Sequence, residues 1–340
     1  MNRPGRLRFK HGSWIAVLGC AAFALVAGAA AQGLSRLEPA AVVATVGDEP
    51  IEAGEVNRRL DELTRGKKIA ADALPIAQAQ ALAEILDRRL ILAYARRTQS
   101  GATAEEVDKA VAELHQRLAA QQRSLGDYLR DQAMTEGDLR RQIAWKLTWE
   151  RYLAKYVTEP RLASYFEAHR REFDGTEVMA SHILLQPAPG SGPQDVDSLV
   201  KQARAIREEI ASGRISFEEA ARKHSAGPSG KEWGRLGPVP RRGVMDEAFS
   251  RAAFALQPGQ ISPPVKSPFG VHLIRCDAIK PGRKSLADAR AELEEALARE
   301  LFEKLARVEL KHTPVRFTGK APYFKPGTEE LVLPPPDQGA

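Results

Sequence analysis

The sequence predicts an α+β protein with a helical N-terminal domain and a second domain built on a small, mostly antiparallel sheet. Between residues 74 and 156, apolar residues recur at helical spacing, which indicates packed amphipathic helices. From residue 176, strand-like runs alternate with short helical segments over about a hundred residues. The chain has 340 residues, of which 43% are hydrophobic and 28% charged, so it can form two or three domains with sizeable cores.

The first 31 residues predict a signal peptide or an N-terminal membrane anchor. Four basic residues and no acid precede an apolar run over residues 14–31, which ends in small residues. This order is typical of a secretory signal, and cleavage is expected after Ala31. Because 18 apolar residues can also just span a bilayer, a retained anchor that attaches the protein to the membrane through residues 14–31 is the alternative.

Charge and metal-ligand spacing argue against several classes of partner. The formal net charge is +6, but the four basic residues of the N-terminal segment account for most of it and the remainder is +2, so no nucleic-acid partner is expected. Cys276 is the only cysteine beyond that segment, so no internal disulfide is expected. The histidines do not show zinc-ligand spacing, and phosphate-binding or dinucleotide motifs are missing. Neither a metal nor a cofactor is therefore expected.

Residues 40–173 predict the helical domain. A short strand over residues 41–46 and a turn at 47–50 precede a helix within residues 74–98. Thr103 and Thr135 each stand three residues before an acid, which predicts a capping box at two further helix starts.

Four aromatic residues recur on one face of the helix that follows Thr135. They are spaced to lie on one stripe, so they predict either a packed core or an apolar trough for unfolded chains, and the sequence does not separate these alternatives. The four residues are Trp145, Trp149, Tyr152 and Tyr156.

Residues 176–280 predict the smaller α+β domain. A strand over 177–185 and a loop over 187–193 lead to a helix over 195–213 and to another that opens with Ser216 and Glu219. A glycine-rich loop follows. The domain then continues with a helix near 246–256, a turn at 257–260 and a strand over 271–276.

The segment after residue 285 predicts a long amphipathic helix over residues 285–312. Its leucine stripe needs a partner, and the natural partner is the helical N-terminal domain, which would then be discontinuous in sequence. Residues 313–340 are expected to form a proline-rich tail, whose end over residues 331–340 has little fold of its own.

Five segments in order carry a family resemblance. They read ASHILL, SFEEAARKHS, GPSGKEWGRLG, MDEAFSRAAFAL and QPGQISPPVKSPFGVHLIRC between residues 180 and 276. This series resembles the parvulin, or PpiC-type, peptidyl-prolyl cis-trans isomerases over about residues 176–278. The flanking segments resemble the SurA and PrsA/PpiD-type chaperones.

The resemblance implies a site for proline isomerisation. It assigns His182 and His272 to a pair that hold each other by hydrogen bonds on adjacent strands, with the hydroxyl of Ser267 beside them. It also implies a substrate-binding cup for the proline ring. The cup residues are Leu236, Met245 and Phe249.

Two positions in the glycine-rich loop depart from the family pattern. Gly227 stands where many parvulins carry cysteine or aspartate near the substrate carbonyl, and Arg235 stands where the family usually has aspartate. Because isomerisation breaks no covalent bond, these changes predict reduced activity rather than none. We also expect that Arg235 disturbs the local pairing of the loop.

The resemblance predicts an exported prolyl isomerase and folding chaperone for unfolded or newly translocated, proline-containing polypeptides. The expected location is the periplasm after signal cleavage, or the inner membrane with the domains facing the periplasm. The main alternative is a parvulin-fold chaperone that binds peptides without significant isomerase activity. A structural or adaptor protein with no client preference is a third interpretation.

Overall fold

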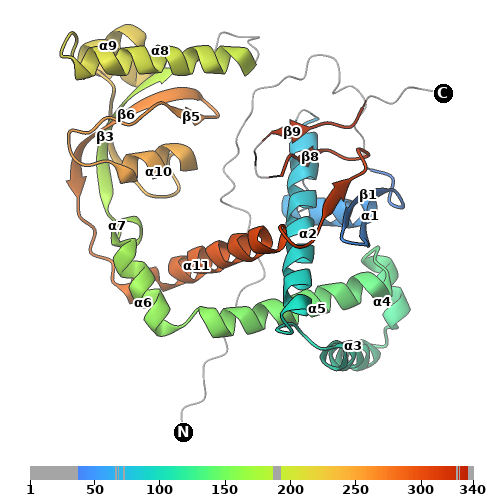
Figure 1. The fold of residues 1–340 in the computed structure, drawn as a ribbon. Helices are drawn as coiled ribbons and strands as arrows, with labels where there is room; N and C mark the ends of the chain where they lie inside the picture. Colours follow the sequence, from blue (N-terminus) through green and yellow to red (C-terminus); the bar gives the residue numbers. More distant parts are fainter. Residues whose placement is uncertain are drawn as a thin grey trace. The chain divides into compact units, whose positions relative to one another are not determined.

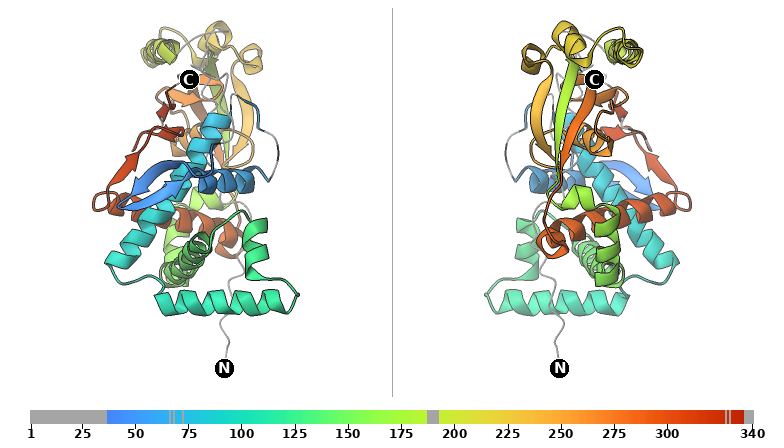
Figure 2. Two further views of the ribbon diagram at one scale, coloured as in Figure 1. Left: turned by 90° about the vertical axis from the view of Figure 1, so that its right-hand side faces the viewer. Right: turned by 90° about the vertical axis from the view of Figure 1, so that its left-hand side faces the viewer.

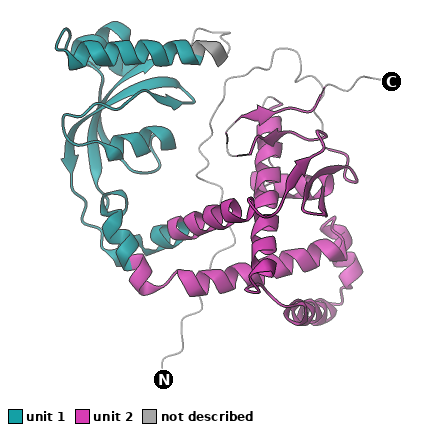
Figure 3. Ribbon diagram, in the orientation of Figure 1, with its two compact units in different colours: residues 1–26, 163–295 teal, residues 27–162, 296–340 magenta. Residues whose placement is uncertain are grey.

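The computed structural model describes residues 37–335 except 66, 68, 72, 187–192, 327 and 329. The proposed signal or anchor segment and most of the loop expected at 187–193 therefore lie outside the described residues. The described chain divides into two compact units, coloured separately in Figure 3. Unit 1 comprises residues 163–295, and unit 2 comprises the residues up to 162 together with those from 296 onward. Within the described residues, no helix combines the length and the apolar character needed to cross a membrane.

Unit 2 contains a three-stranded antiparallel sheet and several helices (Figure 1). The expected helix starts at Thr103 and Thr135 are confirmed, because each side chain accepts a hydrogen bond from the backbone N–H three residues on and a complete capping box forms. The helix expected within 74–98 is also confirmed. The helices are α1 (Ala53–Thr64), α2 (Leu74–Arg97), α3 (Ala104–Ala119), α4 (Leu125–Asp131), α5 (Glu136–Tyr156) and α6 (Glu159–Ala168), of which α6 continues into unit 1.

The C-terminal segment is more ordered than its proline content suggests. A strand near the C-terminus pairs with the first strand, and Thr318 extends this pairing because its N–H donates to the carbonyl of Val43 at 3.1 Å. The rings of Phe317 and Tyr323 stack with centroids 3.9 Å apart. The segment expected to be a tail therefore contains paired strands, and the expectation of little fold over residues 331–340 is wrong for the strand at Leu331–Val332. The sheet has the order β2 (Glu49–Glu52), β1 (Val42–Val46), β7 (Val315–Phe317), and β8 (Tyr323–Phe324) pairs with β9 (Leu331–Val332).

Helix α11 (Leu286–Glu309) begins in unit 1 and ends in unit 2. Within unit 2, Phe302 of α11 meets the rings of Trp145 and Trp149 edge-on, in both cases with centroids 5.7 Å apart. Glu309 is buried and pairs with Arg97 of α2 at 2.7 Å. The aromatic stripe of α5 therefore contacts α11 inside the unit.

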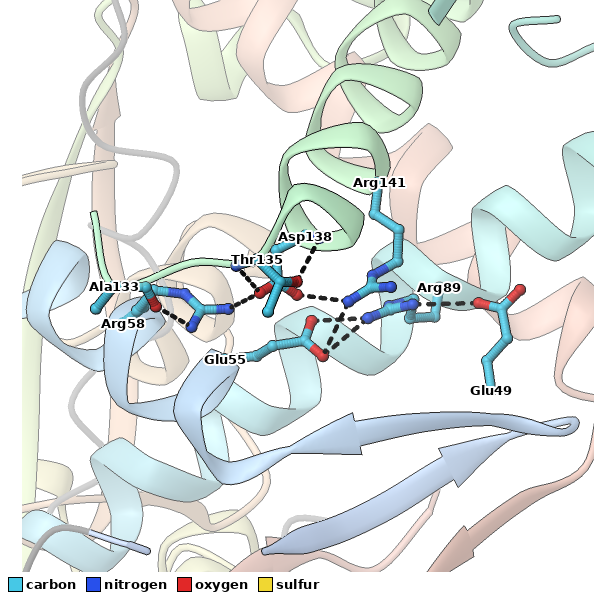
Figure 4. Close-up of polar contacts among 8 residues, drawn as sticks. All are labelled: Glu49, Glu55, Arg58, Arg89, Ala133, Thr135, Asp138 and Arg141. Carbon is cyan, nitrogen blue, oxygen red and sulfur yellow. Dashed lines mark hydrogen bonds and ion pairs between the residues drawn. The ribbon is translucent and has the colours of Figure 1, made fainter. Parts of the chain in front are cut away.

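A network of charged side chains joins four elements of unit 2 (Figure 4). Arg89 of α2 is buried, and its guanidinium contacts Glu49 of β2 at 3.1 Å and Glu55 of α1 at 2.7 Å. Arg141 of α5 lies beside Glu55 and pairs with Asp138, its own neighbour on the same helix. The network lines a cavity of about 800 Å³ and ties strand β2 to three helices.

Unit 1 is built on a four-stranded antiparallel sheet whose strands lie side by side in Figure 2. The α+β fold class with small antiparallel sheets is thus confirmed. The last long strand reaches Lys280, well beyond the expected end at residue 276. The order is β4 (Arg235–Pro240), β3 (Glu177–Leu185), β6 (Gly270–Lys280), β5 (Val265–Ser267), and the helices are α7 (Arg170–Phe173), α8 (Pro193–Ala211), α9 (Phe217–His224), η1 (Pro228–Glu232) and α10 (Glu247–Ala255).

Alternate residues of β3 and β6 pack into two separate cores. Because side chains of a strand point to opposite faces in turn, Val178 and Ala180 of β3 join Phe249 and Phe254 of α10 in one cluster. Ile183 of β3 belongs to a second cluster on the other face, with residues of α8 and α9. The face that packs against α10 is the one that carries both histidines of interest.

Candidate functional site

Two buried histidines meet at the centre of the unit 1 sheet. His182 lies on β3 and His272 on the neighbouring β6, where they stand diagonally because Leu184 is the residue paired with His272. Their Nδ1 atoms are 3.3 Å apart, and their rings stack with centroids 5.5 Å apart. The structure therefore brings together the two histidines that the sequence singles out.

Each histidine also contacts a serine hydroxyl through its second ring nitrogen. Ser267 Oγ lies 2.6 Å from Nε2 of His272 and accepts a hydrogen bond from the backbone N–H of Phe269 at 3.1 Å. On the other side, Ser229 Oγ lies 2.7 Å from Nε2 of His182. The result is a continuous chain of four groups: hydroxyl, imidazole, imidazole, hydroxyl.

Burial keeps both imidazoles uncharged at neutral pH. It lowers the pKa of His182 from 6.5 to about 4. It lowers the pKa of His272 from 6.5 to about 3, and the neighbouring His182 contributes to this decrease. A neutral imidazole has one donor and one acceptor nitrogen, so the pair can form a directional hydrogen-bond chain but no ion pair.

The three expected cup residues lie in one hydrophobic cluster. Leu236 of β4 and Met245 before α10 are partly buried and pack against the cluster that contains Phe249. Phe249 is itself only 2% exposed, and its ring stands edge-on to both histidines. Phe249 thus forms a wall between the histidines and the core, whereas Leu236 and Met245 provide the accessible apolar surface.

The glycine-rich loop closes over His182. Gly227 has φ −76°, and a Cβ there would lie 3.7 Å from Nε2 of His182, which is ordinary contact. A side chain would therefore fit at position 227 without strain. Gly234 differs, because it has φ +82° and a Cβ there would lie 2.6 Å from the carbonyl oxygen of His182. The loop requires glycine at 234 but not at 227.

Arg235 takes part in strand pairing. It is the first residue of β4 and pairs with Ser181, and the β3–β4 register shifts between Ala180 and Ser181. The side chain of Arg235 is exposed, so it lies away from the buried histidine pair. Arg235 is therefore part of the β3–β4 ladder, and whether it disturbs the local pairing stays a prediction.

Ser229 is the member of the site that sequence reasoning missed. It lies in the short 3₁₀ helix η1, which the sequence presents only as part of a glycine-rich loop. The sole signal is its type, a hydroxyl two residues after Gly227. Among the described residues, no group of three potential metal-ligating side chains gathers at this or any other place.

The sheet with helices on both faces, the facing histidines and the glycine-rich loop together define a parvulin-type domain. Residues 182–278 match the PpiC-type PPIase domain, and residues 6–153 match the SurA-like N-terminal domain. Over 219 residues the chain is 30% identical to Foldase protein PrsA 2 of Bacillus cereus, covering 62% of this chain and 68% of that protein. The chain belongs to the PpiC-type, or parvulin, family.

Further relatives match different shares of the chain. Peptidyl-prolyl cis-trans isomerase Pin1 of Malus domestica is 36% identical over 114 residues, which are 30% of this chain and 93% of that protein. Chaperone SurA of Thiobacillus denitrificans is 26% identical over 247 residues, and the chain spans only 55% of its length. The chain also matches the crystal structure of PrsA from Bacillus anthracis with 26% identity and a TM-score of 0.36. The match covers 68% of this chain and 96% of the PrsA chain.

Proposed function

We propose that the protein is a peptidyl-prolyl cis-trans isomerase that also holds unfolded polypeptides. The observation that carries this proposal is the chain of Ser229, His182, His272 and Ser267 beside the apolar cluster around Phe249. Rotation of an X–Pro bond must cross a barrier of about 18–20 kcal/mol that arises from amide resonance. Since no covalent bond breaks, a site accelerates rotation by binding the twisted amide more tightly than the planar one.

The proposed roles follow from what each group can contact. Leu236 and Met245, with Phe249 as the wall behind them, would bind the proline ring. His182, His272 and Ser267 would form the polar floor that orients the amide. Gly227 would line the substrate site beside Nε2 of His182, where a small side chain also fits. Each such interaction that favours the twisted amide by about 1.4 kcal/mol increases the rate about tenfold.

The site needs neither an acid nor a nucleophile to work in this way. Both histidines are neutral at physiological pH, because burial lowers their pKa values to about 4 and about 3. A neutral hydrogen-bond chain keeps the floor in a fixed geometry without adding a buried charge. This property suits a reaction whose transition state differs from its ground state in amide geometry rather than in net charge.

We assign the binding of unfolded chains to the helical part of the molecule. The proposed domains are residues 40–173 with the docked helix 285–312, and the isomerase domain over residues 176–280. The names Chaperone SurA and Foldase protein PrsA, borne by relatives that align with both parts, support this assignment. The basic and then apolar N-terminal segment supports export, so we place the protein in the periplasm after cleavage following Ala31.

The test of the isomerase proposal is the cis-to-trans rate of short X–Pro peptides with the purified protein. Met245→Ala should raise KM several-fold because it removes part of the apolar cup. Met179→Ala, which truncates a partly buried methionine of β3 outside that cluster, should leave the rate unchanged. No acceleration by a protein that still suppresses aggregation would instead indicate a peptide-binding chaperone.

Cell fractionation tests the proposed location. The mature protein should be recovered in the periplasm with a mass that corresponds to a start at Gln32. Recovery of the full-length chain in the inner-membrane fraction would indicate a retained anchor over residues 14–31.

A further inference from the structure

We infer that Ser229 is a positioning residue of this site, and that its hydroxyl is the polar group which the loop lacks at Gly227. This inference rests on the proposed isomerase function. Ser229 is 9% exposed, and its Oγ lies 2.7 Å from Nε2 of His182. In the described part of the chain, no other side chain of the glycine-rich loop forms a hydrogen bond with either histidine.

The backbone around Ser229 is fixed on both sides. Its carbonyl accepts a hydrogen bond from the N–H of Gly234 at 2.7 Å, and the N–H of Gly230 donates to the carbonyl of Gly227 at 2.9 Å. Gly230 packs so closely that a Cβ there would lie 2.9 Å from the carbonyl oxygen of Ser225. The hydroxyl is thus presented to His182 by a rigid turn.

Hydrogen-bond balance shows what this contact does. One hydrogen lies between the two Nδ1 atoms, and each neutral ring has one N–H. If His182 holds that hydrogen, its Nε2 accepts from the Ser229 hydroxyl, and Nε2 of His272 donates to Ser267. If His272 holds it, Ser267 donates to His272, and Nε2 of His182 donates to Ser229. The two end hydroxyls therefore decide together which tautomers the pair adopts.

Loss of the Ser229 hydroxyl would unbalance this chain. Nε2 of His182 would then lack its partner in either arrangement, in a place where burial makes an unpaired polar atom costly. A side chain at position 227 can reach the same nitrogen, because a Cβ there would lie 3.7 Å from both Nε2 of His182 and Oγ of Ser229. A hydroxyl at 227 should therefore replace one at 229.

The experiment moves the hydroxyl and measures X–Pro isomerisation with the full protein. Ser229→Ala should lower kcat about tenfold while KM changes less than twofold, because the polar floor is altered and the apolar cup is not. The double variant Gly227→Ser with Ser229→Ala should return kcat to within about threefold of the unmodified protein. Ser225→Ala is the matched control, since that hydroxyl accepts from the N–H of Leu184 and touches neither histidine.

Two outcomes would overturn the inference: Ser229→Ala with unchanged kcat, or a folded double variant as slow as Ser229→Ala. Imidazole ¹⁵N NMR provides a second readout, in which Ser229→Ala should shift the Nε2 signal of His182 and Ser225→Ala should not. If the unmodified protein accelerates no X–Pro peptide, the proposed function fails. The ¹⁵N signals then decide the positioning role alone, and an unchanged spectrum would refute it.

Discussion

The ring of Phe249 meets the ring of His272 edge-on, with centroids 5.3 Å apart and planes at 83°. It meets His182 in a similar way at 5.8 Å. One apolar side chain from α10 therefore holds both imidazoles in place on the sheet. Phe249 thus connects the packing of the hydrophobic core with the geometry of the site.

Phe249→Ala should destabilise unit 1 as well as impair the site. The side chain is 2% exposed, and removing a buried phenylalanine costs about 3–5 kcal/mol of unfolding free energy. Phe249→Leu keeps most of the volume, so it should cost less than about 1.5 kcal/mol while it removes the edge-on contacts. Urea unfolding measures the free energy of unfolding of both variants. Equal losses of stability in Phe249→Ala and Phe249→Leu would contradict the prediction.

The histidine pair should make stability depend on pH below 6.5. Folding lowers both histidine pKa values, to about 4 and about 3, so the unfolded chain binds protons first as the pH falls. The contribution of the two histidines to the free energy of unfolding is complete above pH 6.5. Below pH 6.5, the contribution of each histidine falls by about 1.4 kcal/mol per pH unit until the pH reaches its pKa in the folded protein. Unfolding titrations at pH 7, 6 and 5, compared between the unmodified protein and His182→Gln, measure this slope, because buried Asp87, whose pKa is raised to about 7, adds a slope of opposite sign to both proteins. His182→Gln should show a shallower slope, whereas isomerisation should stay independent of pH between 5 and 8.

Arg89→Met should destabilise unit 2 strongly. The Arg89 side chain is 6% exposed, and the Glu55 side chain is 15% exposed. Loss of Arg89 would remove the cation that contacts Glu55 at 2.7 Å. Breaking a buried ion pair from one side costs about 3–5 kcal/mol. Arg96→Met is the control, because Arg96 also lies on α2 and pairs with Glu49 but is 61% exposed, so its loss should cost less than about 1 kcal/mol. Similar unfolding midpoints for the two variants would exclude a buried role for Arg89.

Gly270→Ala should disrupt the turn that carries Ser267 to His272. Gly270 has φ +132°, and a Cβ there would lie 2.2 Å from the carbonyl oxygen of Leu185. The β5–β6 turn would have to move, at a cost of about 3 kcal/mol or more. Gly243→Ala isolates the effect of backbone strain, since Gly243 has φ +87° with nothing within 4 Å, and should cost about 1–2 kcal/mol. In thermal unfolding, the melting temperature of Gly270→Ala should therefore be well below that of Gly243→Ala.

Most secondary structure could be predicted because its causes are local. The capping boxes at Thr103, Thr135 and Ser216 all form, since an N-cap side chain and the residue three positions on suffice to define them. Strand β7 was missed because its stability comes from pairing with β1, some 270 residues earlier in the chain, and its own three residues carry no pattern.

The residues of the site also fall into those that could be predicted and those that only the folded structure reveals. The resemblance to the parvulin family implies that His182 and His272 form a pair, and the structure places their Nδ1 atoms 3.3 Å apart. The position of Ser229 could not be predicted, because its contact with His182 depends on the curvature of η1 and on the close packing of Gly230. Residue type shows that a hydroxyl is present in the loop, and only the folded turn shows which nitrogen it faces.

The pairing of β1 with β7 sets an order of events during synthesis. Unit 1 lies wholly between these two strands in the chain, so residues 163–295 leave the ribosome before β7 is made. Unit 1 can complete its fold while β1 still has an unpaired edge, which is the kind of surface that recruits foreign strands. Until β7 is added, this edge of β1 is therefore open to pairing with other chains.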